Sequence, residues 1–317
     1  MSDTTESVSA PLAPDTCVMT LPALHARLRC IDPAGHAADA PLFCWSDPEP
    51  GVYAHGYAAA DCWRFDGDVV VLQPDELIEE VPVALAYGGE APIVMMATPL
   101  DAEDFARGFA ISEGIVDRAD QIIDIEAVPA NGGLLVRIKL AEGLPARVAA
   151  RRRLGAGSGA CGLCGVDQIE NALRTPALVP EGERFTASAI REAFAQLPDL
   201  QRIGAHTGAA HGAAFADRRG RILAFAEDAG RHNALDKLIG KVARLGIDPC
   251  SGFCAVTSRA SFEMAQKTAA ARFPMLCAIS APTGLAVRLA RACNLTLCAF
   301  VRGQRFACYA TPQRLRG

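Results

Sequence analysis

The sequence predicts an α/β protein whose C-terminal region contains a sheet with parallel strands, preceded by a smaller α+β region. Between residues 253 and 301, short apolar runs alternate with amphipathic helical patterns in the order β-α-β-α-β, which is typical of a parallel sheet. Earlier in the chain, short β-rich runs lie close together around Gly88-Gly89, a turn signal. With 317 residues, 50% of them hydrophobic, the chain can bury a large core.

The smaller α+β domain is expected over residues 63–146, after a variable and partly disordered extension over residues 1–62. Strands are predicted at 68–73, 81–87, 92–98, 121–128 and 134–140. A helix is predicted from Asp101, because acidic residues occupy its first turn and Phe105, Phe109 and Ile115 give it an apolar face.

Residues 147–165 interrupt this pattern and are predicted to form a flexible Arg- and Gly-rich loop. Arg147 and residues 151–153 precede a glycine-rich run, and the stretch GACGLCG places Cys161 and Cys164 at CxxC spacing. A helical pattern resumes at 166–173. The C-terminal α/β domain is therefore expected over residues 166–317.

Strands and helices alternate through the C-terminal domain. The run 231–246 is predicted to form an amphipathic helix that ends at Gly246, since its leucines, Ile239 and Val242 share one face. Two paired strands are predicted within 204–228. The remaining elements are strands at 253–257, 275–280 and 295–301 and helices at 261–272 and 283–293.

Composition excludes several classes of protein. The net charge of −5 argues against a general nucleic-acid binder. The first residues carry no secretory signal, and no apolar run is long enough to span a membrane, so we expect a cytoplasmic protein. No P-loop or dinucleotide-binding glycine motif is present. Most of the 12 cysteines are expected to be reduced and to pack as small apolar residues.

Polar residues follow each of the three predicted parallel strands, where ligands bind in open sheets. Ser258 and Arg259 follow the first strand, Ser280 and Thr283 follow the second, and Arg302-Gly303-Gln304-Arg305 follow the third. Hydroxyl groups, guanidinium groups and helix N-termini together favour a site for a phosphate-bearing ligand. Ordinary helix capping explains any one of these segments taken alone.

The string EDAGRHNALDK (227–237) forms a second polar cluster. His232 and Asp236 are four residues apart on the predicted helix, so Asp236 is a candidate to orient the imidazole. A solvated helix start with a salt bridge is the alternative. His206 and His211 are candidates to line the same pocket, or are ordinary core histidines.

Three interpretations of Cys161 and Cys164 stay open on the residues alone. A structural zinc site would need two more ligands, from Cys250 and Cys254 or from a histidine. A redox pair is favoured by the lowered thiol pKa of CxxC motifs. A carrier of persulfide sulfur is favoured by the flanking glycines, because a cysteine on a mobile loop can reach both a donor and a pocket.

Several strings, taken together, resemble the formate dehydrogenase accessory sulfurtransferases of the FdhD/NarQ family. They are PIVMMATP…DFARGFAISEGIV (92–116), ACGLCG (160–165), HTGAAHGAAF (206–215), EDAGRHNALDKLIG (227–240), SRASFEMAQK (258–267) and SAPTGLAVRLA…LTLCAFVRGQRFACY (280–309). The resemblance covers about residues 65–312, in the family's order.

The resemblance implies a sulfur carrier. Cys161 would hold a persulfide taken from a cysteine desulfurase, and Cys164 would assist. The sulfur would pass to the molybdenum of the bis(molybdopterin guanine dinucleotide) cofactor, which serves formate dehydrogenase. The segment Phe300-Val301-Arg302-Gly303-Gln304-Arg305 matches the family's cofactor-binding segment, and Ser258, Arg259, Ser280, Thr283 and His232 are expected to contribute.

The resemblance further implies a homodimer and a cytidine-deaminase-like fold for the C-terminal domain. Zinc deaminases need H-x-E and P-C-x-x-C motifs, and this chain has neither. We therefore expect no intrinsic metal site. The alternative function is a non-catalytic cofactor-binding chaperone with an incidental dithiol.

Overall fold

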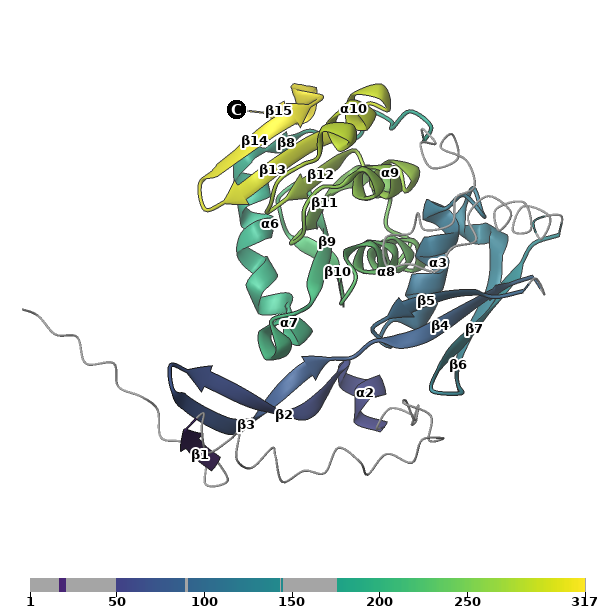
Figure 1. Cartoon of the computed structure of the whole chain (residues 1–317). Coiled ribbons are helices and arrows are strands. Elements are labelled where there is room, and N and C mark those ends of the chain that lie inside the picture. Colours follow the sequence, from purple (N-terminus) through teal and green to yellow (C-terminus); the bar gives the residue numbers. More distant parts are fainter. Residues whose placement is uncertain (1–16, 21–49, 89–90, 143, 145–175, 317) are drawn as a thin grey trace, which may run out of the picture. The chain divides into compact units, whose positions relative to one another are not determined.

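The computed structural model describes residues 17–20, 50–88, 91–142, 144 and 176–316 (Figure 1). These residues fall into two compact units, which are described separately. The first unit includes residues 59–77, and the second includes residues 46–58 and 78–317. The domain boundaries expected at residues 62, 146 and 165 stay predictions. Residues 146 and 165 both lie outside the described residues.

The first unit contains a three-stranded sheet in the order β1-β3-β2, with β1 antiparallel to β3. Gly67 lies in the turn between β2 and β3 with a φ of +57°, a conformation that glycine adopts without strain. The strand β3 agrees with the run predicted at 68–73, whereas β2 was not predicted. The strands are β1 (Cys17–Thr20), β2 (Tyr57–Asp66) and β3 (Val69–Ile78).

A four-stranded sheet in the order β5-β4-β7-β6 begins the second unit. Its strands β4 and β5 are antiparallel, as the turn signal at Gly88 predicts. The helix α3 covers one face, and Phe105, Leu85 and Val136 are fully buried between them. The elements are α2 (Pro50–His55), β4 (Val81–Tyr87), β5 (Ile93–Ala97), α3 (Ala102–Ser112), β6 (Ile122–Ala130) and β7 (Gly133–Leu140).

A six-stranded mixed sheet in the order β10-β9-β11-β12-β13-β14 forms the larger part of the unit (Figure 1). The neighbours β11, β12 and β13 are parallel, which confirms the prediction from the β-α-β-α-β pattern. The other pairings are antiparallel. The strands are β9 (His211–Asp217), β10 (Ile222–Asp228), β11 (Gly252–Val256), β12 (Met275–Ala278), β13 (Thr296–Arg302) and β14 (Arg305–Ala310).

Helices cover both faces of this sheet. The helices α8, α9 and α10 bury one apolar cluster, which includes Leu235, Met264 and Leu289. The helix α6 buries a second cluster on the opposite face, with Ile190 against Phe253. The helices are α6 (Ala187–Leu200), α7 (Arg202–Thr207), α8 (Arg231–Arg244), α9 (Phe262–Ala270) and α10 (Gly284–Ala292), and a small parallel pair is formed by β8 (Phe185–Thr186) and β15 (Leu315–Arg316).

The prediction of a strand from residue 204 is wrong at its start, because residues 202–207 form α7. The Glu227 carboxylate accepts hydrogen bonds from the backbone N–H groups of Ile203 and Gly204 at 3.0 and 2.9 Å and so satisfies free donors at the start of this helix. Gly208 ends it with a φ of +66°. The strand begins only at His211.

Two glycines allow α3 and α8 to pack closely. A Cβ atom on Gly108 would lie 1.7 Å from the Asp236 backbone oxygen, and one on Gly240 would lie 1.9 Å from the Asp104 backbone oxygen. Any side chain at either position would therefore push the helices apart. This contact joins the four-stranded and six-stranded sheets into a single compact unit.

The architecture is a mixed α/β fold with flanking helices, which agrees with the predicted class. Within the described residues, no helix has the length and apolar character needed to cross a membrane.

Candidate functional site

The candidate site lies at the end of the six-stranded sheet where the carboxyl ends of β10, β11, β12 and β13 come together. This end is called the sheet edge below. The antiparallel strand β9 begins at the same edge, and its first residue, His211, lies opposite Asp228 at the end of β10. The hydroxyl of Thr257, after β11, accepts a hydrogen bond from the Gly212 N–H at 2.8 Å. Five strands thus deliver polar residues to one place, as expected for an open α/β sheet.

Backbone hydrogen bonds bring the three predicted loop segments together. The Thr283 N–H donates to the Ala260 oxygen at 3.0 Å, and the Phe300 N–H donates to the Ser280 oxygen at 3.2 Å. The Ala260 N–H in turn donates to the Ala281 oxygen at 3.2 Å. Ser258, Arg259, Ser280 and Thr283 therefore lie on adjacent segments, as the sequence predicts.

The helices α8, α9 and α10 all begin at this edge. The Thr283 hydroxyl accepts from the Ala286 N–H at 3.2 Å and caps α10, which confirms that Thr283 has a capping role. The Ser258 side chain is buried, and its hydroxyl donates to the Arg259 oxygen at 3.1 Å. Of the four predicted loop residues, Arg259 and Thr283 are exposed.

The hairpin between β13 and β14 carries residues 300–305. Phe300 is exposed and has a left-handed φ of +55°, and Gly303 in the turn has a φ of +53°. Val301 is fully buried against the α6 side of the sheet, so its side chain cannot contact a ligand. Arg302, Gly303, Gln304 and Arg305 are all exposed.

The positive charges of this edge are not neutralised within the described part of the chain. Arg259, Arg302 and Arg305 are exposed and form no ion pair with any described residue. Unpaired guanidinium groups and helix N-termini at the same end of a sheet favour a phosphate-bearing anion.

The start of α8 adds a partly buried group of polar side chains to the same edge. His232 Nε2 lies 3.5 Å from the Glu263 carboxylate, and the two side chains are only 5% and 17% exposed. Burial would raise the pKa of Glu263, but the interaction with His232 and hydrogen bonds from its own N–H and Ser261 outweigh burial and lower this pKa to about 2. Because His232 is so deeply buried, we expect it to position the loop before α9 and not to contact a ligand directly.

His211 and Arg231 complete this group. Burial lowers the pKa of His211, and the positive charge of nearby Arg231 lowers it further, so the imidazole is neutral at pH 7. Neither Arg231 nor Glu263 was singled out from the sequence. Arg231 could have been found as a charged residue at the first position of a helix that follows an edge strand.

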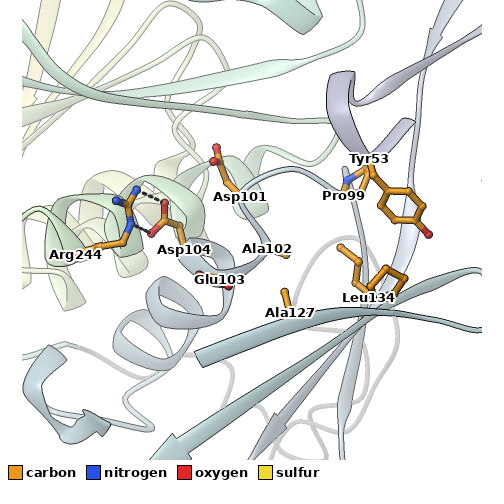
Figure 2. Close-up of a pocket in the computed structure, with 10 residues that line it drawn as sticks. Tyr53, Pro99, Asp101, Ala102, Glu103, Asp104, Ala127, Leu134 and Arg244 are labelled. Carbon is orange, nitrogen blue, oxygen red and sulfur yellow. Dashed lines mark hydrogen bonds and ion pairs between the residues drawn. The ribbon is translucent and has the colours of Figure 1, made fainter. Parts of the chain in front are cut away.

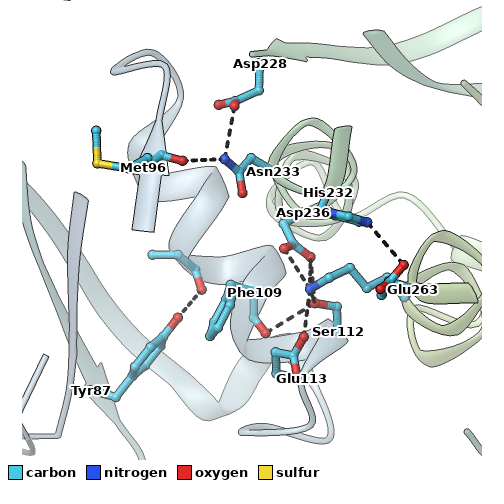
Figure 3. A network of polar contacts seen from close by, with 12 residues as sticks. Tyr87, Met96, Phe109, Ser112, Glu113, Asp228, His232, Asn233, Asp236 and Glu263 are labelled. Atoms are coloured by element: carbon cyan, nitrogen blue, oxygen red, sulfur yellow. Dashed lines mark hydrogen bonds and ion pairs between the residues drawn. The ribbon is translucent and has the colours of Figure 1, made fainter. Parts of the chain in front are cut away.

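The predicted pairing of Asp236 with His232 is wrong. Asp236 accepts hydrogen bonds from Lys267 Nζ at 2.8 and 3.1 Å and from the Ser112 hydroxyl at 2.6 Å, and Figure 3 shows that Glu263 lies next to the imidazole instead. Lys267 also contacts Glu113 at 2.8 Å. Asp236 and Glu113 keep the pKa of Lys267 raised despite its burial. Asp236 therefore joins α3, α8 and α9 and lies away from the edge.

A second buried network anchors the start of α8 to the end of β5. Lys237 Nζ lies 2.7 Å from the Asp228 carboxylate and donates to the Thr98 oxygen at 2.8 Å. The Asn233 amide donates to Asp228 at 3.1 Å and to the Met96 oxygen at 2.8 Å (Figure 3). Much of the polar string 227–237 thus stabilises the junction between the sheets.

His206 does not share a pocket with His211. It stacks on Tyr57 with ring centroids 4.7 Å apart and lines a hollow of about 640 Å³ beside α7, together with Arg202 and Glu227. The residues that line this hollow do not include His211.

Another pocket, of about 520 Å³, lies at the start of α3 (Figure 2). Asp101, Glu103 and Asp104 line it, and Asp104 forms a two-bond ion pair with Arg244 at 2.8 Å. These carboxylates disfavour an anionic ligand, so the sheet edge with its unpaired arginines is the better candidate site.

Cys161 and Cys164, with the basic loop before them, lie outside the described residues. The proposed zinc partner Cys254 is fully buried in the apolar core, and burial raises its pKa well above the ordinary value, which opposes metal binding. Within the described ranges, His, Cys, Asp and Glu side chains form no group of three or more that could hold a metal ion.

The chain is similar to several known proteins. The sequence model of the FdhD/NarQ family matches residues 78–316. A protein of Cupriavidus necator named sulfur carrier protein FdhD is 47% identical over 290 residues, which cover 91% of this chain and 98% of the relative. A protein of Bordetella petrii with the same name is 44% identical over 261 residues, 82% of this chain and 94% of the relative.

The fold is also found in a solved structure. The crystal structure of a Desulfotalea psychrophila protein assigned as a formate dehydrogenase accessory protein superposes with a TM-score of 0.67 at 20% identity, covering 82% of this chain and 99% of that one. The family match includes every segment of the sheet edge, from His211 to Arg305. The chain is therefore a member of the FdhD/NarQ family.

Proposed function

We propose that this protein is a sulfur carrier that delivers persulfide sulfur to the molybdenum of the bis(molybdopterin guanine dinucleotide) cofactor for formate dehydrogenase. The observation that carries the proposal is the 47% identity over nearly the whole chain to a protein named sulfur carrier protein FdhD. The accessory role for formate dehydrogenase rests on the resemblance of the motifs and on the assignment of the related crystal structure.

The sulfur would travel on Cys161. The Cys161 thiolate attacks the outer sulfur of a persulfide on a cysteine desulfurase, whose own thiol leaves, and Cys161 then carries the persulfide. Passing on that outer sulfur restores the Cys161 thiol. The cysteine Cys164, three residues further along the CxxC motif, would assist this exchange.

The sheet edge supports the second half of the proposal. The cofactor is the client of the protein, and its guanine dinucleotide arms carry phosphates. Arg259, Arg302 and Arg305 are exposed and form no ion pair with a described residue. Arg259 directly precedes α9, and the hairpin that carries Arg302 and Arg305 is hydrogen-bonded through Phe300 to Ser280, just before α10. Guanidinium groups and helix N-termini are suited to bind such phosphates. Phe300 is exposed on the same hairpin and could pack against the planar base.

Sulfur loading is tested by intact-mass spectrometry after incubation with a cysteine desulfurase and cysteine. The proposal predicts a reducible gain of one sulfur, ~32 Da, that is lost in Cys161→Ala. A matched control is Cys250→Ala, because Cys250 is a half-buried thiol on the 3-10 turn before β11, outside the CxxC motif.

The alternative function, a non-catalytic cofactor-binding chaperone, also has an observation in its favour. The unpaired arginines of the sheet edge would bind the cofactor whether or not a thiol carries sulfur. A chaperone of that kind would bind the cofactor but gain no sulfur on any variant, with an active desulfurase present. That result would contradict the sulfur-carrier proposal and favour the chaperone.

A further inference from the structure

Three cysteines form a row across adjacent strands of the six-stranded sheet. Cys277 in β12 lies opposite Cys298 in β13, and Cys298 lies opposite Cys308 in β14. All three belong to the apolar cluster on the α6 face of the sheet. Residues directly opposite each other on neighbouring strands point to the same face of the sheet, so the three thiol side chains lie side by side on this face.

The antiparallel pair within this row satisfies the distance requirement of a disulfide. Residues directly opposite each other on antiparallel strands have Cα atoms about 4.5–5.5 Å apart, and disulfides span Cα distances of about 4.4–6.8 Å. Cys298 and Cys308 are such a pair. Their strands are joined by the short turn at Gly303, so bond formation needs no large movement of the backbone.

Accessibility differs along the row. Cys277 and Cys298 are fully buried, whereas Cys308 is only partly buried. It lies on β14, the last strand of the sheet, which has a strand neighbour on one side only. A small reagent from solution therefore reaches Cys308 first.

We propose that Cys298 and Cys308 are a disulfide-forming pair that low-molecular-weight disulfides such as oxidised glutathione convert from two thiols to a cross-strand bond. The Cys308 thiolate attacks oxidised glutathione, and one glutathione thiolate leaves with a proton from solution. Cys298 then attacks the Cys308 sulfur and gives up its own proton, and the second glutathione leaves as a thiol. The protein loses two hydrogens, and one oxidised glutathione becomes two reduced molecules. This modification site is independent of the sulfur-carrier proposal.

The surroundings of the pair set the speed of the exchange. The hydrogen bond with Cys298 and then burial raise the pKa of the Cys308 thiol, so little thiolate is present at pH 7. The pair is therefore slow to oxidise at neutral pH and reacts faster as the pH rises. The bond, once formed, closes the base of the hairpin that carries Phe300–Arg305 and should slow amide hydrogen exchange in residues 299–307.

The test uses the full-length protein, incubated anaerobically with oxidised glutathione at pH 7 and pH 9, acid-quenched, alkylated and digested with trypsin. Cleavage after Arg291, Arg302, Arg305 and Arg314 separates the two cysteines into peptides 292–302 and 306–314. The expected product is these two peptides joined, two hydrogens lighter than their sum, formed faster at pH 9. Fragment spectra place the bond on Cys298 and not on Cys293 of the same peptide.

Cys250 provides the internal control, since it is partly buried and no cysteine lies opposite it among the described strands. It should keep a glutathione adduct, and Cys308→Ser should lose the joined peptide and keep that adduct. The proposal is overturned if Cys308 holds a stable glutathione adduct without joining Cys298. It is equally overturned if Cys298 or Cys308 bonds a different cysteine, or if both stay unmodified while Cys250 reacts.

Discussion

Asp228 and Lys237 form an ion pair of 2.7 Å in which neither side chain is exposed to solvent. Lys237 also donates to the Thr98 oxygen, and the Thr98 N–H donates to Asp228 at 3.0 Å. The pair therefore joins the end of β5 to the start of α8, and the candidate edge depends on this junction because β10 ends at Asp228.

Removing one partner of this buried pair should lower the free energy of unfolding by far more than the loss of a typical surface ion pair does. Lys237→Met leaves the Asp228 carboxylate buried without its cation, and we expect the free energy of unfolding to fall by about 3–5 kcal/mol. Urea unfolding measures this change. The control is Arg137→Met, which breaks a pair with Glu126 whose side chains are 58% and 61% exposed, and should cost less than ~1 kcal/mol. Equal effects of the two variants would contradict the account.

The contact between α3 and α8 predicts an unfavourable glycine-to-alanine change. Alanine has the higher helix propensity, by about 1 kcal/mol, yet a Cβ at Gly240 would lie 1.9 Å from the Asp104 oxygen. We expect Gly240→Ala to lower the free energy of unfolding by at least ~2 kcal/mol. Gly284→Ala is the matched control, since its Cβ would meet only the Arg288 Nη1 atom at 3.6 Å. Stabilisation in both variants would show that the helices do not pack this closely.

Glu263 should make stability depend on acid pH. Its folded pKa of about 2 lies below the usual value near 4.3 of an unfolded chain. The ionised carboxylate therefore stabilises the fold above pH ~4.3, and this contribution is lost as the pH falls toward 2. We expect Glu263→Gln to be less stable than the wild type at pH 7, with a difference that narrows toward pH 3.

Urea midpoints measured between pH 7 and pH 3 follow this difference. The exposed Glu126 provides the control, and Glu126→Gln should differ little from the wild type throughout. A difference for Glu263→Gln that stays constant with pH would mean that its carboxylate is not stabilised by His232.

Local patterns predicted the C-terminal sheet because each of its parallel strands is a short apolar run and each helix between them has an amphipathic pattern. The strand run MLCAIS and the helix that follows Thr283 were placed to within two residues of β12 and α10. The edge residues Ser258 and Ser280 followed from that prediction, since the topology of parallel strands brings their ends together.

Elements that depend on distant partners could not be predicted. The helix α7 begins where Glu227, more than 20 residues later, accepts its first N–H groups. A solvated start of α8 was the alternative interpretation of the string 227–237, yet every residue from His232 to Gly240 is buried. The reason is that α3 covers this face through the Gly108 contact, and α9 supplies Lys267 to Asp236. No periodicity in a single helix reveals such partners.

The most direct test of the central claim measures binding of guanosine diphosphate, a probe for one arm of the cofactor, by calorimetry. If the sheet edge binds the phosphates, Arg302→Ala/Arg305→Ala should raise the Kd at least about tenfold, because each charge-assisted hydrogen bond contributes roughly 1.5–3 kcal/mol. Arg218→Ala, an exposed arginine in the β9–β10 turn at the opposite edge of the sheet, should leave the Kd unchanged. Equal affinity of the double variant and the wild type would contradict the claim that this edge is the cofactor site.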